Sequence, residues 1–208
     1  MNDPYHVYRP MLDLIGKSEG TDKGRGYNET LGYGAYTGGD RNLTSMTLDE
    51  IEQLQGAMLR HPRNRFNSSA LGRYQIVRAT LRKLKIALRL PGTAKFDASL
   101  QDRLGCHLMR GRGIDVWLAG DMSDRALMDA LAKEWASLPT SAGAGHYDGQ
   151  RASVSTLQVG LALDEVRRRH LESRSPKLAV PAETPVAFND SLSAAILRIL
   201  KSLFGRTA

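Results

Sequence analysis

The sequence predicts an α+β fold that is mainly α. Five stretches between residues 47 and 173 carry apolar residues at roughly helical spacing, and most of them begin at a capping residue and end at Gly or Pro. Before them, residues 24–40 are rich in Gly, Tyr and Thr, a composition typical of turns and short strands. The chain of 208 residues is long enough for one domain plus appendages.

The first helices are indicated by local signals. Residues 10–18 predict a short helix, and residues 24–40 predict either a small sheet in the form of a hairpin or a loop. A second helix is expected to begin at Thr47, because Thr47 and Glu50 form a capping-box pair, and to end at the sequence HPRN. Residues 68–90 predict the next helical region, which Pro91 and Gly92 end.

The later helices have equally local boundaries. Residues 96–113 predict a helix with Asp97 as its cap and a glycine, Gly111 or Gly113, as its stop. Residues 122–139 predict another, which begins at Ser123 and ends at Pro139. Residues 153–173 predict the last helix of the main domain, which we expect to span residues 1–173.

Two segments follow this expected domain. Pro and Ser accumulate in residues 174–189, which predicts a linker. Residues 190–208 predict a basic amphipathic helix, in which Leu192, Ile196, Ile199 and Leu203 share one face.

Composition narrows the classes of partner and of cofactor. The net charge of +7 favours polyanionic partners such as nucleic acid, anionic lipid or cell wall. The single cysteine, Cys106, excludes an intramolecular disulfide, and no Cys/His spacing indicates a metal, so neither metal nor cofactor is expected. No secretory leader and no apolar run of about 20 residues are present, so the protein is expected to be made in the cytoplasm and to need outside help for export.

The first candidate for chemistry is Glu19, which ends the first predicted helix and precedes a Gly-rich segment. A partly buried Glu can carry a proton near neutral pH, and cleavage of a glycosidic bond needs a proton at the leaving oxygen. Glycines let the backbone approach a bulky polymer closely. Taken alone, the same stretch also fits a surface Glu followed by a flexible loop.

Four motifs in order favour the catalytic interpretation: SEGTDKGRGYN at 18–28, SALGRYQI at 69–76, SLQDRLG at 99–105 and WASLP at 135–139. Together they resemble the lambda-type phage endolysins, peptidoglycan-cleaving enzymes of the lysozyme-like superfamily, over roughly residues 10–170. The resemblance implies a lysozyme-like fold with a small β-hairpin lobe and a helical lobe. It also implies cleavage of the β-1,4 bond between N-acetylmuramic acid and N-acetylglucosamine, by a monomer that acts in the periplasm or cell wall on peptidoglycan glycan strands and needs no nucleic acid.

The resemblance also assigns roles to residues. Glu19 is the expected catalytic acid, and Gly72 to Gln75 the expected cleft wall opposite it. Gln75 can bond a sugar amide or hydroxyl, and Arg73 belongs to the same motif. Tyr74 fits either a ring-stacking residue or a core aromatic. Tyr147, in the loop AGAGHYDG, is a candidate for the border of the cleft, whereas Trp135 fits a core anchor better than a sugar platform.

Asn28 departs from the pattern, because relatives carry an acid after Gly-Tyr. An amide can donate a hydrogen bond to substrate but cannot act as a general base. A hydrolytic muramidase normally needs a second carboxylate, whereas a lytic transglycosylase can work with one. The sequence therefore favours the transglycosylase route and 1,6-anhydro products. Asp22, Glu29 and Asp40 remain candidates for a second acid, and a non-catalytic basic wall- or nucleic-acid-binding protein remains the alternative from another class.

The terminal segment is a candidate membrane binder. Its apolar face includes Leu192, Ile196, Ile199 and Leu203, and its polar face carries Arg198 and Lys201. A helix of this length, roughly 22 Å, is too short to span a bilayer but can lie in its interface. The alternative is a helix docked on the main domain or on another copy.

A variant that ends at Ser173 tests the membrane interpretation. Burial of four or five Leu and Ile side chains contributes ~1.5–3 kcal/mol each. Each cation near an anionic surface adds roughly 1 kcal/mol, and together these contributions offset the cost of ordering the segment. The variant should therefore keep its activity on purified peptidoglycan and lose sedimentation with anionic vesicles. Equal vesicle binding by both proteins would disprove the proposal, and loss of activity on purified wall would show a docked helix instead.

Overall fold

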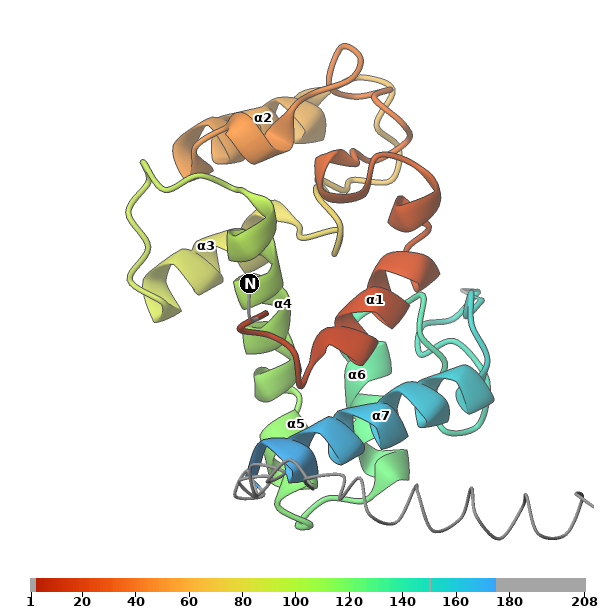
Figure 1. Cartoon of the computed structure of the whole chain (residues 1–208). Helices are drawn as coiled ribbons and strands as arrows, with labels where there is room; N and C mark the ends of the chain where they lie inside the picture. Colours follow the sequence, from red (N-terminus) through yellow and green to blue (C-terminus); the bar gives the residue numbers. More distant parts are fainter. Residues whose placement is uncertain (1–2, 150, 175–208) are drawn as a thin grey trace, which may run out of the picture. The chain divides into compact units, whose positions relative to one another are not determined.

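The computed structural model describes residues 3–149 and 151–174, which belong to one compact unit (Figure 1). Its helices, in chain order, are α1 (Arg9–Ser18), the 3-10 helices η1 (Thr21–Lys23), η2 (Gly26–Asn28) and η3 (Leu43–Ser45), then α2 (Leu48–Arg60), α3 (Arg78–Ala87), α4 (Ala98–Gly111), α5 (Ile114–Leu118), α6 (Asp124–Glu134) and α7 (Thr156–Arg174). The prediction of a mainly α fold is confirmed. The predicted linker and amphipathic helix lie outside the described residues.

Most of the predicted helix starts are confirmed, because their signals are local. Thr47 and Glu50 form the reciprocal capping box at the start of α2. Asp97 accepts a hydrogen bond from the Leu100 N–H at the start of α4, and Ser123 does the same for Ala126 in α6. Each of these side chains therefore satisfies a backbone donor that the helix leaves unpaired.

The hairpin predicted for residues 24–40 is not formed. Within the described residues there is no strand, and Thr30 makes only an isolated antiparallel bridge to Leu71. The segment contains η2 and a series of turns, with positive φ angles at Gly26, Gly32, Tyr33, Gly34, Gly38 and Gly39. So many left-handed residues reverse the chain repeatedly, and no stretch stays extended long enough to pair.

The helix predicted for residues 68–90 is shorter than expected, because α3 begins only at Arg78. Residues 71–76 instead form a tight turn, closed by reciprocal backbone hydrogen bonds between Leu71 and Ile76. Gly72 has φ +76° there, and a Cβ on it would lie 2.3 Å from Oε1 of Gln101. The turn therefore needs glycine for both its backbone angle and its close packing.

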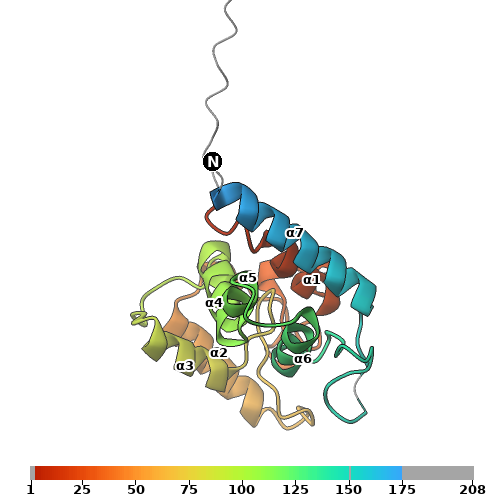
Figure 2. The same cartoon turned by 90° about the horizontal axis from the view of Figure 1, so that it is seen from below.

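One hydrophobic core joins the helices of the described unit. α2 packs against α3, while α1 packs against α7 and α4. α4 extends from the region of α2 and α3 at one end to α5 at the other (Figure 1). Figure 2 shows α7 lying across α1 on the outside of the unit. None of the described helices is both long and apolar enough to cross a membrane.

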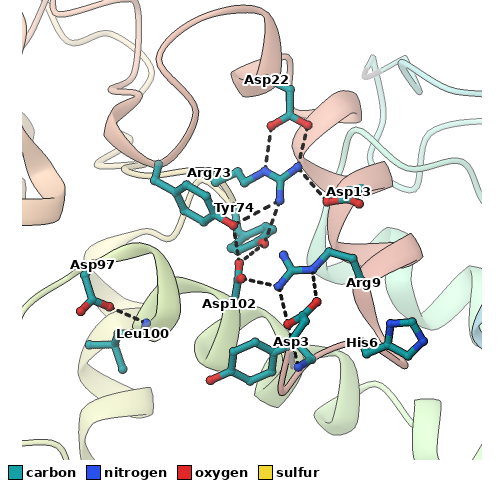
Figure 3. Close-up of polar contacts among 12 residues, drawn as sticks. Asp3, His6, Arg9, Asp13, Asp22, Arg73, Tyr74, Asp97, Leu100 and Asp102 are labelled. Carbon is teal, nitrogen blue, oxygen red and sulfur yellow. Dashed lines mark hydrogen bonds and ion pairs between the residues drawn. The ribbon is translucent and has the colours of Figure 1, made fainter. Parts of the chain in front are cut away.

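A carboxylate in the middle of α4 joins three segments that are distant in sequence. The buried Asp102 accepts hydrogen bonds from Arg9 in α1 at 2.7 Å, from Tyr27 in η2 at 2.7 Å and from Tyr74 in the 71–76 turn (Figure 3). Arg9 also pairs with Asp3 at 2.8 Å. Because a buried charge is stable only when it is paired and hydrogen-bonded, Asp102 fixes these segments against α4.

Replacement of Asp102 tests the role of this contact in stability. Asp102→Ala should lower the free energy of unfolding by about 3–5 kcal/mol, because it leaves two tyrosine hydroxyls without their acceptor and Arg9 with Asp3 as its remaining carboxylate. Asp102→Asn, which keeps an acceptor, should cost less. Urea unfolding measures both.

Asp115 supplies the control, since it also accepts from a tyrosine, Tyr8, but is half exposed. Asp115→Ala should cost at most about 1 kcal/mol. Equal losses for Asp102→Ala and Asp115→Ala would show that the α4 carboxylate does not hold the fold together.

Candidate active site

Glu19 occupies the C-terminal end of α1, where its N–H still donates to the Ile15 carbonyl at 2.9 Å. Gly20 follows with φ +76°, a conformation that ends helices and that glycine adopts without strain. The Ser-Glu-Gly sequence thus stops the helix immediately after the carboxylate. The end of α1 therefore fixes the position from which the Glu19 side chain projects.

Two serines connect the Glu19 carboxyl group to the backbone of α1. Oγ of Ser137 lies 2.6 Å from Oε1 of Glu19 and 2.9 Å from Oγ of Ser18. The Ser18 hydroxyl in turn donates to the Ile15 carbonyl at 3.0 Å. Ser18 is buried, whereas Ser137 and Glu19 are half-buried.

Burial raises the pKa of Glu19 above its ordinary value, and the hydrogen bond with Ser137 lowers it by less. Ser137 donates its hydroxyl proton to Oε1 of Glu19, and a hydrogen bond to the carboxylate favours the ionised form. Burial has the larger effect, so Glu19 keeps its proton to a higher pH than a free glutamate does.

Glu19 opens onto a cleft of about 400 Å³, which we call the Glu19 cleft. Its lining comes from the end of α1, the 68–80 segment, α4 and the end of α6: Glu19, Leu31, Ser68, Ala70, Tyr74, Gln75, Ile76, Val77, Thr80, Leu108, Glu134, Trp135 and Ala136. These side chains include two carboxylates and no cation. The cleft is polar enough to bond sugar hydroxyls and apolar enough to pack against a ring.

Two residues of the GRYQ motif line this cleft in different ways. The ring of Tyr74 is buried, and its hydroxyl donates to Asp102, so its main contacts are with the core. Burial, with the Asp102 contact adding to it, raises the pKa of Tyr74. Gln75 has φ +47°, an unusual angle for a residue other than glycine, and its Nε2 donates to the Gly72 carbonyl at 2.9 Å. Among the described residues none donates to Oε1 of Gln75, which leaves this oxygen for a ligand.

Arg73, the neighbour of Tyr74, points away from the Glu19 cleft and does not line it. Its guanidinium makes two hydrogen bonds to Asp22, at 2.7 and 2.8 Å, and one to Asp13 at 3.0 Å (Figure 3). It also stacks on the ring of Tyr27, 5.3 Å from the centroid. These contacts connect the 71–76 turn to α1 and η1.

The surroundings differ among three further residues that the sequence analysis singled out: Asn28, Tyr147 and Trp135. Asn28 accepts a hydrogen bond from the Thr44 N–H at 2.9 Å, and Tyr147 donates to the Lys133 carbonyl at 2.9 Å. Neither lines the Glu19 cleft. Trp135 is buried and donates from Nε1 to the Tyr74 carbonyl at 3.2 Å, as expected of a core anchor.

None of the three sequence candidates for a second acid lines the Glu19 cleft. Asp22 is bound to Arg73, and the exposed Asp40 pairs with Arg25 at 3.4 Å. Glu29 is buried and accepts from the backbone N–H groups of Arg25 and Thr30. These carboxylates therefore hold local structure.

The carboxylate that sequence reasoning missed is Glu134, the last residue of α6. It lines the Glu19 cleft and accepts two hydrogen bonds from Arg112, at 2.8 and 2.6 Å, both on Oε2. The only signal in the sequence was its place directly before WASLP. Within the described residues no group of three or more His, Cys, Asp or Glu side chains is arranged to hold a metal ion.

Comparisons with known proteins agree with this site. A family model described as Endolysin matches residues 9–161. The endolysin of Escherichia phage lambda is 27% identical over 147 residues, which are 70% of this chain and 85% of that protein. No solved structure gives a significant match. Because the family model covers well over half of the sequence, the chain belongs to the endolysin family, the enzymes with which phages degrade the bacterial cell wall.

Proposed function

We propose that this endolysin is a lytic transglycosylase that cleaves the β-1,4 bond between N-acetylmuramic acid and N-acetylglucosamine and leaves 1,6-anhydro ends. The observation that carries the proposal is the contrast between the two carboxyl groups of the Glu19 cleft. Among the described residues, the carboxyl group of Glu19 is hydrogen-bonded by the Ser137 hydroxyl and has a raised pKa, whereas Glu134 is bound by the guanidinium of Arg112. The cleft therefore offers one carboxyl group that can give up and regain a proton.

In the proposed mechanism, the protonated Glu19 donates its proton to the glycosidic oxygen as the bond to C1 of the muramic acid breaks. The resulting carboxylate then removes the proton from the C6 hydroxyl of the same sugar. Oxygen 6 bonds to C1 and closes the 1,6-anhydro ring. Glu19 ends in its starting protonation state, and no water enters the products.

The other residues of the cleft have supporting roles in this proposal. Oε1 of Gln75 accepts a hydrogen bond from an amide or hydroxyl of the sugar. Ser137, which Ser18 bonds in turn, donates to the carboxyl group of Glu19 and holds it in place between the two transfers. We also propose that residues 1–173 form a lysozyme-like catalytic domain that works as a monomer, with a helix near the C-terminus that binds anionic membrane.

A hydrolytic muramidase is the second candidate, and Glu134 is the observation that favours it. A carboxylate on the same cleft as Glu19 can activate a water molecule if Arg112 releases it. The two routes differ in their products and in their dependence on Glu134. Both differences are measurable.

Glu19→Gln should lower the lytic rate on purified peptidoglycan by at least 10²–10⁴-fold, since the amide keeps the size of the side chain but has no proton to give. The circular dichroism spectrum should not change. Glu134→Gln, on the same cleft, is the matched control and should stay within about tenfold of the wild type. A Glu19→Gln variant with a normal rate would remove Glu19 from the mechanism. An equal loss in both variants would indicate two-carboxylate hydrolysis.

Mass spectrometry of the digested muropeptides should show 1,6-anhydromuramic ends, which are lighter than reducing ends by one water. This follows because the C6 hydroxyl, and not a water molecule, attacks C1. A digest that contains reducing ends alone would establish hydrolysis and would direct attention to Glu134.

A further inference from the structure

A second cavity of about 350 Å³ adjoins the Glu19 cleft, and we call it the Lys83 cavity. It lies between α3, α4 and the end of α6. The two hollows share Thr80, Leu108 and Glu134 in their linings. A ligand in the Glu19 cleft can therefore extend a substituent across this shared wall.

The Glu19 cleft and the Lys83 cavity are lined by charges of opposite sign. The Glu19 cleft is lined by two carboxylates and no cation, whereas the Lys83 cavity brings together Lys83 and Arg112 with Glu134 as its one acid. His107 adds a nitrogen that can bond a carboxylate. Lys83 belongs to α3 and His107 to α4, and Arg112 directly follows α4, so the packing of these two helices brings the basic groups together.

Both cations keep donors for a ligand. Lys83 is exposed, and no described residue accepts a hydrogen bond or forms an ion pair with its ammonium group. Arg112 uses Nε and Nη2 for one oxygen of Glu134, so that Nη1 keeps its two N–H groups for another acceptor. Leu84 and Ala87 supply an apolar side to the same cavity.

We propose that the Lys83 cavity binds a carboxylate of the peptide stem that peptidoglycan carries on its muramic acid. The proposal rests on the transglycosylase function, because the glycan in the Glu19 cleft is what brings the stem there. The glycan strand itself has no free carboxylate when the stem is attached, whereas the stem has several. The ammonium of Lys83 and Nη1 of Arg112 bind the carboxylate, and the Leu84 and Ala87 side chains contact the small apolar side chains of the stem.

The test uses two charge reversals with the same effect on net charge. Lys83→Glu changes the cavity, and Arg125→Glu changes an exposed residue of α6 outside it. Both are placed in the Glu19→Gln background, and thermal unfolding verifies that both fold. Sedimentation then measures binding to insoluble peptidoglycan and to the same material with its carboxylates converted to amides.

Lys83→Glu should bind intact peptidoglycan roughly fivefold more weakly than Arg125→Glu, the effect of an ion pair of about 1 kcal/mol. On amidated peptidoglycan the two should bind equally. Equal binding to the intact material, or a difference that survives amidation, would overturn the proposal. Sedimentation measures binding without cleavage, so it tests the stem site even if the proposed catalytic function is wrong.

A second measurement separates the stem from the sugars. With Glu19 restored, Lys83→Glu should cut glycan strands that are freed of their stems and have the exposed lactyl carboxylates converted to amides as fast as the wild type does, and intact peptidoglycan more slowly. A loss of the same size on stem-free strands would mean that Lys83 contacts the sugars instead. A wild-type protein that cuts neither substrate would contradict the proposed function, not the stem site.

Discussion

The carboxylate of Asp102 is the contact on which both walls of the Glu19 cleft depend. It binds Arg9 at the start of α1 and Tyr74 in the 71–76 turn, while α4 carries it between them. Glu19 lies at the other end of α1, and Gln75 directly follows Tyr74. One buried charge therefore sets the distance between Glu19 and Gln75, which line the same cleft. Because such a charge is costly without its partners, the arrangement tolerates little displacement.

The chemistry of Glu19 follows from what surrounds it. Arg73, the nearest candidate cation in the motif, is held by Asp22 and Asp13, and Arg112 is held by Glu134. Neither guanidinium is therefore bonded to Glu19, and a nearby cation would lower the pKa of that carboxyl group. Two acidic residues near Glu19 in sequence, Asp13 and Asp22, therefore bind Arg73 and keep this cation from pairing with Glu19. Within the described residues, the Glu19 carboxyl group is hydrogen-bonded by the hydroxyl of Ser137, which Ser18 bonds in turn.

Local signals in the sequence predicted most helix starts, and nonlocal contacts account for what it missed. The caps at Thr47, Asp97 and Ser123 act within one helical turn, so they could be read directly. The 24–40 segment was misjudged because composition indicates turns and short strands alike, and only the backbone angles show that turns exclude pairing. The 71–76 turn replaced the start of a predicted helix because Gln101, far along the chain, packs against Gly72.

In the candidate site, too, the sequence predicted some of the residues and the structure alone revealed the others. The motifs brought Glu19, Tyr74 and Gln75 to attention, and these residues do line one cleft. Motif position could not show that Arg73 and Asn28 bond other parts of the protein. It also could not reveal the pair of Glu134 and Arg112, because the two residues are 22 positions apart with the whole of α5 between them. Tertiary packing alone brings that pair to the border between the Glu19 cleft and the Lys83 cavity.

The protonation state of Glu19 is the central claim, and a carbon-13 NMR titration of its carboxyl group measures it directly. The Glu19→Gln variant assigns the signal by its absence. A folded-state pKa above the ordinary value means that Glu19 keeps its proton as the pH rises past the point where a free glutamate loses it. We therefore predict a midpoint clearly above that of the exposed glutamates of the same protein. A midpoint at or below theirs would show an ionised Glu19 near neutral pH, and the single-acid mechanism would have no proton to deliver.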